Sequence, residues 1–169
     1  MLLEARDITP FIEDFKAKKY DKVCSKGIKL YYGGYTDENF VSLIGVSCSK
    51  VDRINILGML QRSLVETKSS RENSSYFSTL ILQKRLVYQF MIDDLDVSNL
   101  KLPSSNHILS RVFEQLSRGQ YKVLSSSPKL IEINANGRKL ILSLSDDKPQ
   151  KVLIDEYKET GELERHWYQ

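Results

Sequence analysis

The 169-residue sequence contains no apolar run of the roughly 18 residues that a membrane-spanning helix requires, so it predicts no membrane-integral segment. Glycine and proline are scarce, at 8 and 4 residues, and the 41% hydrophobic content is too high for a collagen-like or disordered chain. Neither sign of charge dominates, and a net charge of +3 does not by itself indicate nucleic acid or an acidic membrane surface. We therefore expect a folded chain with one core or two small subdomains.

The sequence also lacks the motifs of the common enzyme classes. It has no glycine-rich phosphate loop, no His-Glu-x-x-His motif and no nucleophile elbow. Its only histidines are His107 and His166, so acid–base catalysis would depend on carboxylates, and no pair of these stands out. The sequence therefore predicts no catalytic residue, no metal site and no cofactor.

Before Pro103, apolar residues recur at helical spacing, most clearly in a stripe of period 3.6 that begins at Tyr20. A polar stretch over 67–75 is expected to be a loop. The helix after it is apolar nearly all round, which is typical of a helix covered on several sides. The helices predicted in this part lie at about 10–18, 20–32, 37–51, 54–65 and 76–92.

Two of these helices carry the same pattern 34 residues apart, which is the tetratricopeptide period. The matching positions are Tyr20 and Ile54, Val23 and Leu57, Gly27 and Gln61, and Leu30 and Leu64. Residues 19–30 resemble the second helix of a tetratricopeptide repeat, and Leu43-Ile44-Gly45 resembles the Leu-Gly pair of the next repeat. The resemblance covers about residues 10–92, although Gly27 stands where that family has an aromatic residue. It implies stacked helical hairpins and a protein-binding role; the alternative is an irregular helical bundle.

After Pro103, one amphipathic helix over about 105–118 precedes segments in which apolar and polar residues alternate. The strands predicted there lie at about 121–125, 129–135, 138–145, 151–158 and 162–168. Asn136-Gly137 is a strong hairpin signal, and as the centre of a turn it pairs Ile133 with Leu140 and Ile131 with Leu142.

Thr160-Gly161 predicts a second hairpin. If these are the central turn residues, Ile154 pairs with Trp167 and Asp155 pairs with His166, so Trp167 is expected to anchor the core. We interpret Asp155 and His166 as a surface pair, because no Ser or Cys nucleophile is placed beside them.

These patterns predict an α+β fold with two parts. Residues 1–102 would form a helical-hairpin domain that resembles tetratricopeptide repeats, and residues 103–169 a helix with a four- or five-stranded antiparallel meander. The second part is similar to the cystatin and nuclear-transport-factor group of folds. Its segment 157–168 also resembles a single repeat of the membrane-occupation-and-recognition-nexus type.

The two cysteines, Cys24 and Cys48, are equidistant from residue 36 in the turn between their helices. In an antiparallel hairpin such residues lie at the same height, within the range of a disulfide. A disulfide and two reduced, buried thiols are both open; metal binding is disfavoured because no Cys-x-x-Cys motif or nearby histidine is present. The N-terminus lacks the features of a secretory signal, which favours the cytoplasm, whereas a disulfide would favour a periplasmic or otherwise exported protein.

One helical stripe opposite the apolar one carries Lys19, Lys22, Lys26 and Lys29. A solvated face is the simplest interpretation, and a docking patch for an acidic partner is the functional one. Nucleic acid is not expected, because no aromatic residues interleave with these lysines.

We expect a non-enzymatic protein-interaction or scaffolding protein. The alternative is a small-molecule carrier, or an unrecognised enzyme, with a pocket between the C-terminal sheet and helix 105–118. A filled core between sheet and helix would favour the first, and a cavity lined by polar groups the second.

Overall fold

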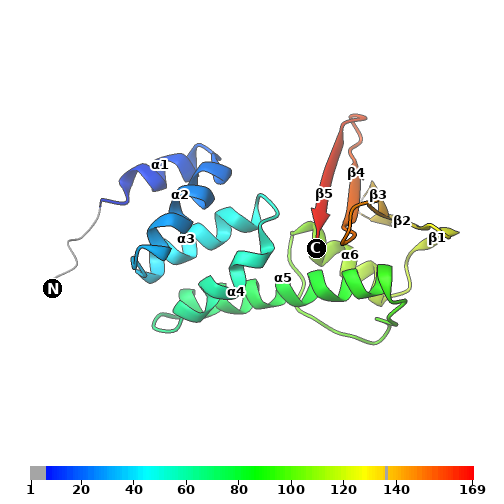
Figure 1. The fold of residues 1–169 in the computed structure, drawn as a ribbon, viewed down its shortest axis with the longest axis horizontal. Helices are drawn as coiled ribbons and strands as arrows, with labels where there is room; N and C mark the ends of the chain where they lie inside the picture. Colours follow the sequence, from blue (N-terminus) through cyan, green and yellow to red (C-terminus); the bar gives the residue numbers. More distant parts are fainter. Residues whose placement is uncertain (1–6, 136) are drawn as a thin grey trace. The chain divides into compact units, whose positions relative to one another are not determined.

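The computed structural model describes residues 7–135 and 137–169 and shows an α+β protein whose helices precede an antiparallel sheet, as predicted (Figure 1). The chain divides into two compact units between Ser78 and Thr79, so the boundary expected after residue 102 falls within the second unit. Among the described residues, no helix combines the length and the apolarity needed to cross a membrane.

The first unit is helical throughout. Its helices are α1 (Thr9–Lys16), α2 (Tyr20–Tyr32), α3 (Glu38–Ser49), η1 (Ile54–Ile56), α4 (Leu57–Leu60), η2 (Gln61–Ser63) and the first part of α5 (Lys68–Ile92). The segment expected to be one helix over 54–65 is helical over 54–63, but it is not a single α-helix: the four-residue α4 lies between the 3₁₀ turns η1 and η2. Its buried residues Ile54, Leu57 and Leu60 are three apart, which is the 3₁₀ period, so the tighter turns keep all three in the core.

The loop expected over 67–75 is also wrong, because α5 begins at Lys68. The hydroxyl of Thr67 accepts a hydrogen bond from the backbone N–H of Ser70 at 3.0 Å, which is a capping interaction. Further along the helix, the Ser74 hydroxyl donates to the carbonyl of Gln61 at 3.0 Å. Tertiary contacts therefore hold a serine-rich stretch in a helix that its intrinsic propensity does not favour.

Helices α2 and α3 approach each other closely at a glycine. A Cβ atom added at Gly27 would lie 2.5 Å from Cγ1 of Ile44, so an aromatic residue has no room at this position. A Cβ at Gly45 on α3 would lie 2.2 Å from the ring of Phe77, which packs there from α5. The two glycines let large side chains fill the centre of this unit.

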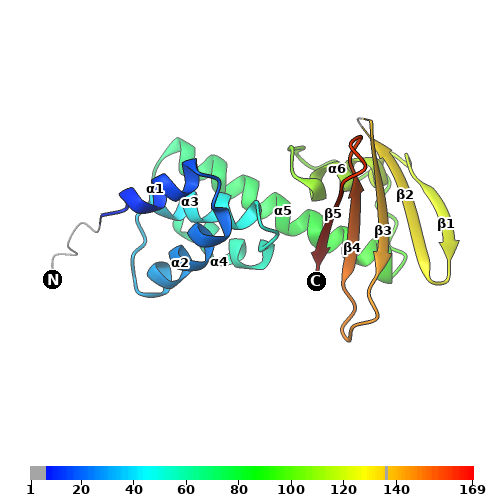
Figure 2. The same ribbon diagram turned by 90° about the horizontal axis from the view of Figure 1, so that it is seen from above.

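The second unit continues α5 and adds one helix and a five-stranded sheet. Its elements are α6 (Ile108–Ser117), β1 (Lys122–Ser126), β2 (Lys129–Ala135), β3 (Arg138–Leu144), β4 (Val152–Tyr157) and β5 (Leu163–Tyr168). The strands form an antiparallel meander in chain order, and Figure 2 shows the sheet in front of α5 and α6. The apolar side chains of α6 and those on the inner face of the sheet are buried in one core, among them Leu109, Val112, Ile133 and Leu140.

The register of the β2–β3 hairpin is the predicted one, with Ile133 opposite Leu140 and Ile131 opposite Leu142. The register predicted for β4–β5 is wrong by one residue, since Trp167 lies opposite Leu153. The reason is the loop length: the N–H of Lys158 donates to the carbonyl of Glu162 at 3.0 Å, which leaves three loop residues instead of two. The last of these, Gly161, has φ +81°, as expected where a type I turn is followed by a left-handed residue.

This shift exchanges the two faces of β5. Trp167, expected in the core, is 52% exposed, and the neighbouring Tyr168 is 2% exposed. A slip of one residue moves every side chain of a strand to the opposite face of the sheet. The anchor of the last strand is therefore Tyr168.

Candidate functional site

The prediction that Cys24 and Cys48 face each other is confirmed, and of the two states that the sequence left open the structure has the disulfide. The two Sγ atoms are 2.13 Å apart and the Cα atoms 4.9 Å apart, and both residues are completely buried between α2 and α3. Because the sulfur atoms are out of contact with solvent, the bond has a structural environment and not that of a reactive thiol.

Of the four predicted lysines, Lys22, Lys26 and Lys29 are exposed on α2, and Lys19 directly precedes this helix. Lys22 is 2.6 Å and Lys19 is 3.7 Å from the carboxylate of Asp14 on α1. The hydrogen bond from Lys22 lowers the pKa of Asp14. Two of the lysines are thus partly neutralised within the unit, and an acidic partner would meet mainly Lys26 and Lys29.

The outer face of the sheet, opposite α6, exposes large side chains on β4 and β5. Tyr157 is 41% exposed and lies opposite Leu163, which is 49% exposed. Trp167 lies on the same face, opposite Leu153. We call Tyr157, Leu163, Trp167 and Arg165 the outer β4–β5 face.

Charged groups on this face are held in place by the sheet. Arg165 makes two hydrogen bonds to Asp155, from Nε to Oδ1 at 2.6 Å and from Nη2 to Oδ2 at 2.7 Å, and this carboxylate raises the pKa of Arg165. Lys151 places its amino group 4.8 Å from the centre of the Trp167 ring. Exposed Trp, Tyr and Arg side chains are the types most enriched among the residues that dominate binding at protein interfaces.

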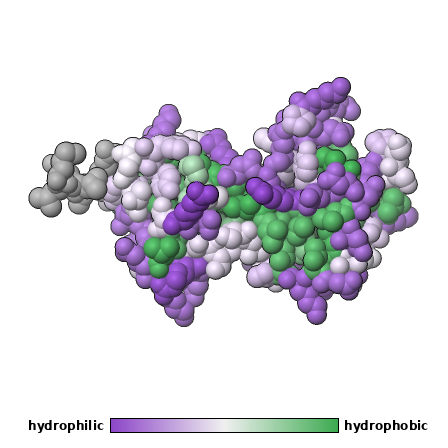
Figure 3. Space-filling view, turned by 60° about the horizontal axis from the view of Figure 1, so that its bottom comes forward, coloured by the Kyte–Doolittle hydropathy of each residue, from purple (hydrophilic) through white to green (hydrophobic). Residues whose placement is uncertain are grey.

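A second apolar area covers the part of α5 in the second unit and the segment after it, as Figure 3 shows. Leu82 and Leu100 are exposed there, so the expectation that this helix is covered on several sides does not hold at Leu82.

The inner face of the sheet carries a charged cluster that sequence reasoning did not identify. Glu156 is buried, and its Oε1 accepts hydrogen bonds from Arg111 on α6 at 2.8 Å and from Arg138 on β3 at 2.9 Å. Burial raises the pKa of Glu156, but the two arginines lower it more, and the net direction is downward. No local motif reveals this cluster, because its members come from three elements that only the tertiary fold brings together.

Glu156, Glu164 and His166 place one potential ligand atom each within 4.8 Å of one another. Such a set suits zinc by donor type. Here, however, Arg111 and Arg138 both pair with Glu156, and Lys158 lies 3.0 Å from Glu164 and 3.3 Å from Glu162, so both carboxylates of the set already have cationic partners. This charge balance disfavours a metal ion, and we interpret the cluster as an internal ion-pair network.

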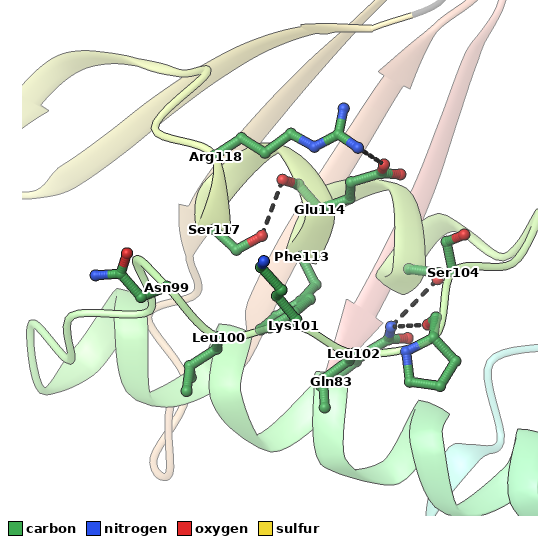
Figure 4. Close-up of a pocket in the computed structure, with 12 residues that line it drawn as sticks. Gln83, Asn99, Leu100, Lys101, Leu102, Ser104, Phe113, Glu114, Ser117 and Arg118 are labelled. Atoms are coloured by element: carbon green, nitrogen blue, oxygen red, sulfur yellow. Dashed lines mark hydrogen bonds and ion pairs between the residues drawn. The ribbon is translucent and has the colours of Figure 1, made fainter.

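A cavity of about 400 Å³ lies between α6, the second part of α5 and the segment 99–104 (Figure 4). It is lined by no residue of a strand, so it is not the pocket expected between the sheet and helix 105–118. Its polar lining includes Gln83, Lys101 and Ser110.

Comparison with models of known protein families, with curated proteins and with solved structures finds no match to this chain.

Proposed function

We propose that this chain is a non-catalytic protein-binding protein that docks a polypeptide on the outer β4–β5 face. The observation that carries the proposal is the exposure of Tyr157, Leu163 and Trp167 on one face of two adjacent strands. Single exposed apolar side chains are common on protein surfaces, whereas several large ones that lie together often mark an interaction site.

Trp167 is the side chain on this face that would contribute most to binding. Its exposed half corresponds to about 100 Å², and burying this area would contribute about 2–3 kcal/mol at ~25 cal/mol per Å². Asp155 already holds the Arg165 side chain in place, so binding of a partner would cost less side-chain entropy at Arg165. The face thus combines an aromatic anchor with a preorganised charge.

The lysine stripe of α2 is a separate candidate surface for an acidic segment of a partner, with Lys26 and Lys29 as its main contacts. The resemblance of residues 10–92 to tetratricopeptide repeats also supports a protein-binding role. We further propose a periplasmic or otherwise exported location in preference to the cytoplasm, because cytosolic thiols are kept reduced and the bonded pair Cys24–Cys48 suits an oxidising compartment.

Site-specific photocrosslinking tests the proposal. A photoreactive phenylalanine analogue at Leu163 or Trp167 should form a defined adduct with a polypeptide in the producing cells, and Arg165→Glu should reduce that adduct. The same analogue at the exposed Lys148 is the control and should give none. Equal adducts at all three positions, or none at Leu163 and Trp167, would overturn the proposal.

A further inference from the structure

The cavity beside α6 has one wall that is apolar and another that is polar. Leu100 and Leu102 line it from the segment after α5, and Phe113 lines it from α6. Opposite charges meet at its edge, where Arg118 Nη2 is 2.6 Å from Glu114 Oε1. A cavity of about 400 Å³ lies in the lower part of the range of small-molecule sites.

Its inner wall contains the buried side-chain amide of Gln83, whose NH₂ group makes hydrogen bonds while its oxygen makes none to residues 7–135 or 137–169. Gln83 is 1% exposed, and its Nε2 donates to the carbonyl of Pro103 at 3.1 Å and to Oγ of Ser110 at 3.2 Å. Its Oε1 has no hydrogen-bond donor among the described residues. Buried acceptors without a donor are rare, because a buried polar atom that makes no hydrogen bond loses its bonds to water without replacement. A ligand with an N–H or O–H group would satisfy this oxygen.

The charge of the cavity is positive. Arg118 is matched by Glu114, but Lys101 makes no ion pair within the described part of the chain. Figure 4 shows the amino group of Lys101 extending from the segment 99–104 toward α6. An anionic group on a ligand would therefore be attracted to Lys101.

We propose that this cavity binds a small organic carboxylate that also carries an amino or hydroxyl donor, such as an α-amino acid or a 2-hydroxy acid with an apolar side chain. The carboxylate pairs with Lys101, the donor reaches Oε1 of Gln83, and the side chain packs on Leu100, Leu102 and Phe113. This site is separate from the outer β4–β5 face and does not rest on the function proposed for that face.

Titration of the ¹⁵N-labelled full chain with four related probes tests the ligand class. L-Leucine and 2-hydroxy-4-methylpentanoate carry both groups, 4-methylpentanoate lacks the donor, and leucinol lacks the carboxylate. At least one of the first two should give saturable shifts that include the Gln83 side-chain amide and the backbone of Lys101 and Ser117. The two incomplete probes should bind about tenfold more weakly, as expected for the loss of one hydrogen bond or ion pair.

Variants test the assigned contacts. Lys101→Gln should weaken binding about tenfold, whereas the matched control Lys148→Gln should not change it. Gln83→Met should abolish the preference for the donor-bearing probe over 4-methylpentanoate. Ser104→Trp, at an exposed position on the rim, should block binding without changing the thermal midpoint.

Several outcomes would overturn the proposal: no saturable shift with any probe, shifts away from the cavity, or equal affinity in Lys101→Gln. An unchanged probe preference in a folded Gln83→Met variant would assign Gln83 a purely structural role and refute its part in recognition. None of these results depends on the photocrosslinking at Leu163 and Trp167, so the two proposals fail independently.

Discussion

Reducing the Cys24–Cys48 bond should destabilise the first unit by an amount set by the loop that the bond closes. The two cysteines are 24 residues apart in the sequence. In the chain-entropy model, a cross-link of this span removes about 11–12 cal/mol/K from the unfolded chain, or about 3.4 kcal/mol at 25 °C. For a unit of this size, the thermal midpoint should fall by roughly 15–25 °C.

Urea unfolding, followed by far-ultraviolet circular dichroism, measures this loss. The oxidised protein is compared with the same protein that has been unfolded, reduced and refolded in reductant. Because both cysteines are completely buried, reductant added to the folded protein should react only after unfolding. The double variant Cys24→Ala/Cys48→Ala is the control, and its midpoint should not respond to reductant.

The dependence of the unfolding free energy on urea shows whether the lost stability comes from the entropy of the unfolded chain or from packing around the free thiols. A cross-linked unfolded chain is more compact, so the oxidised protein should show a smaller dependence of the unfolding free energy on urea. Equal midpoints in the oxidised and reduced proteins would refute the reasoning. A lower midpoint with an unchanged slope would assign the loss to packing around the free thiols instead of to chain entropy.

Three other predictions test the packing and the electrostatics of the fold. Burial raises the pKa of Glu38, but hydrogen bonds, chiefly from the backbone N–H groups before α5, lower it to about 2. Glu38→Gln should therefore be less stable than the wild type above about pH 4.5. The difference between their urea midpoints should vanish as the pH falls toward 2. Equal midpoints at neutral pH would contradict this prediction. Gly45→Ala should cost about 1–3 kcal/mol because its Cβ would overlap the ring of Phe77, and Phe77→Leu in the same chain should recover part of that cost; purely additive losses would be inconsistent with this contact. Trp167→Ala should change the unfolding free energy by less than about 1 kcal/mol and Tyr168→Ala by about 3 kcal/mol, and iodide should quench the native Trp fluorescence; protected, blue-shifted emission would support the other register.

The strands were predicted from the sequence almost to the residue because alternation and turn chemistry are local properties. Asn136 lies outside the described residues, but Gly137 has φ +72°, the left-handed conformation that its place in the predicted turn favours, and Ile133 lies opposite Leu140. The facing of Cys24 and Cys48 was predicted for a related reason: two helices joined by a short turn must run antiparallel, and equal distances from the turn place the residues at equal height.

The errors fall where local signals were ambiguous. Thr160-Gly161 is compatible with a loop of two or of three residues, and this single choice decides which face of β5 carries Trp167. The serine-rich start of α5 has no strong helical preference, and its contacts with Gln61 hold it in the helix.

Sequence alone therefore determined the order of helices and strands, the facing cysteines and the lysine stripe, because each depends on residues close together along the chain. Only the tertiary structure decided the other candidate sites. Glu156 meets Arg111 across 45 residues of sequence, and the cavity brings Gln83 of α5 together with Ser110 of α6, 27 residues away. Such contacts follow from the packing of whole elements against one another, which no short-range pattern encodes.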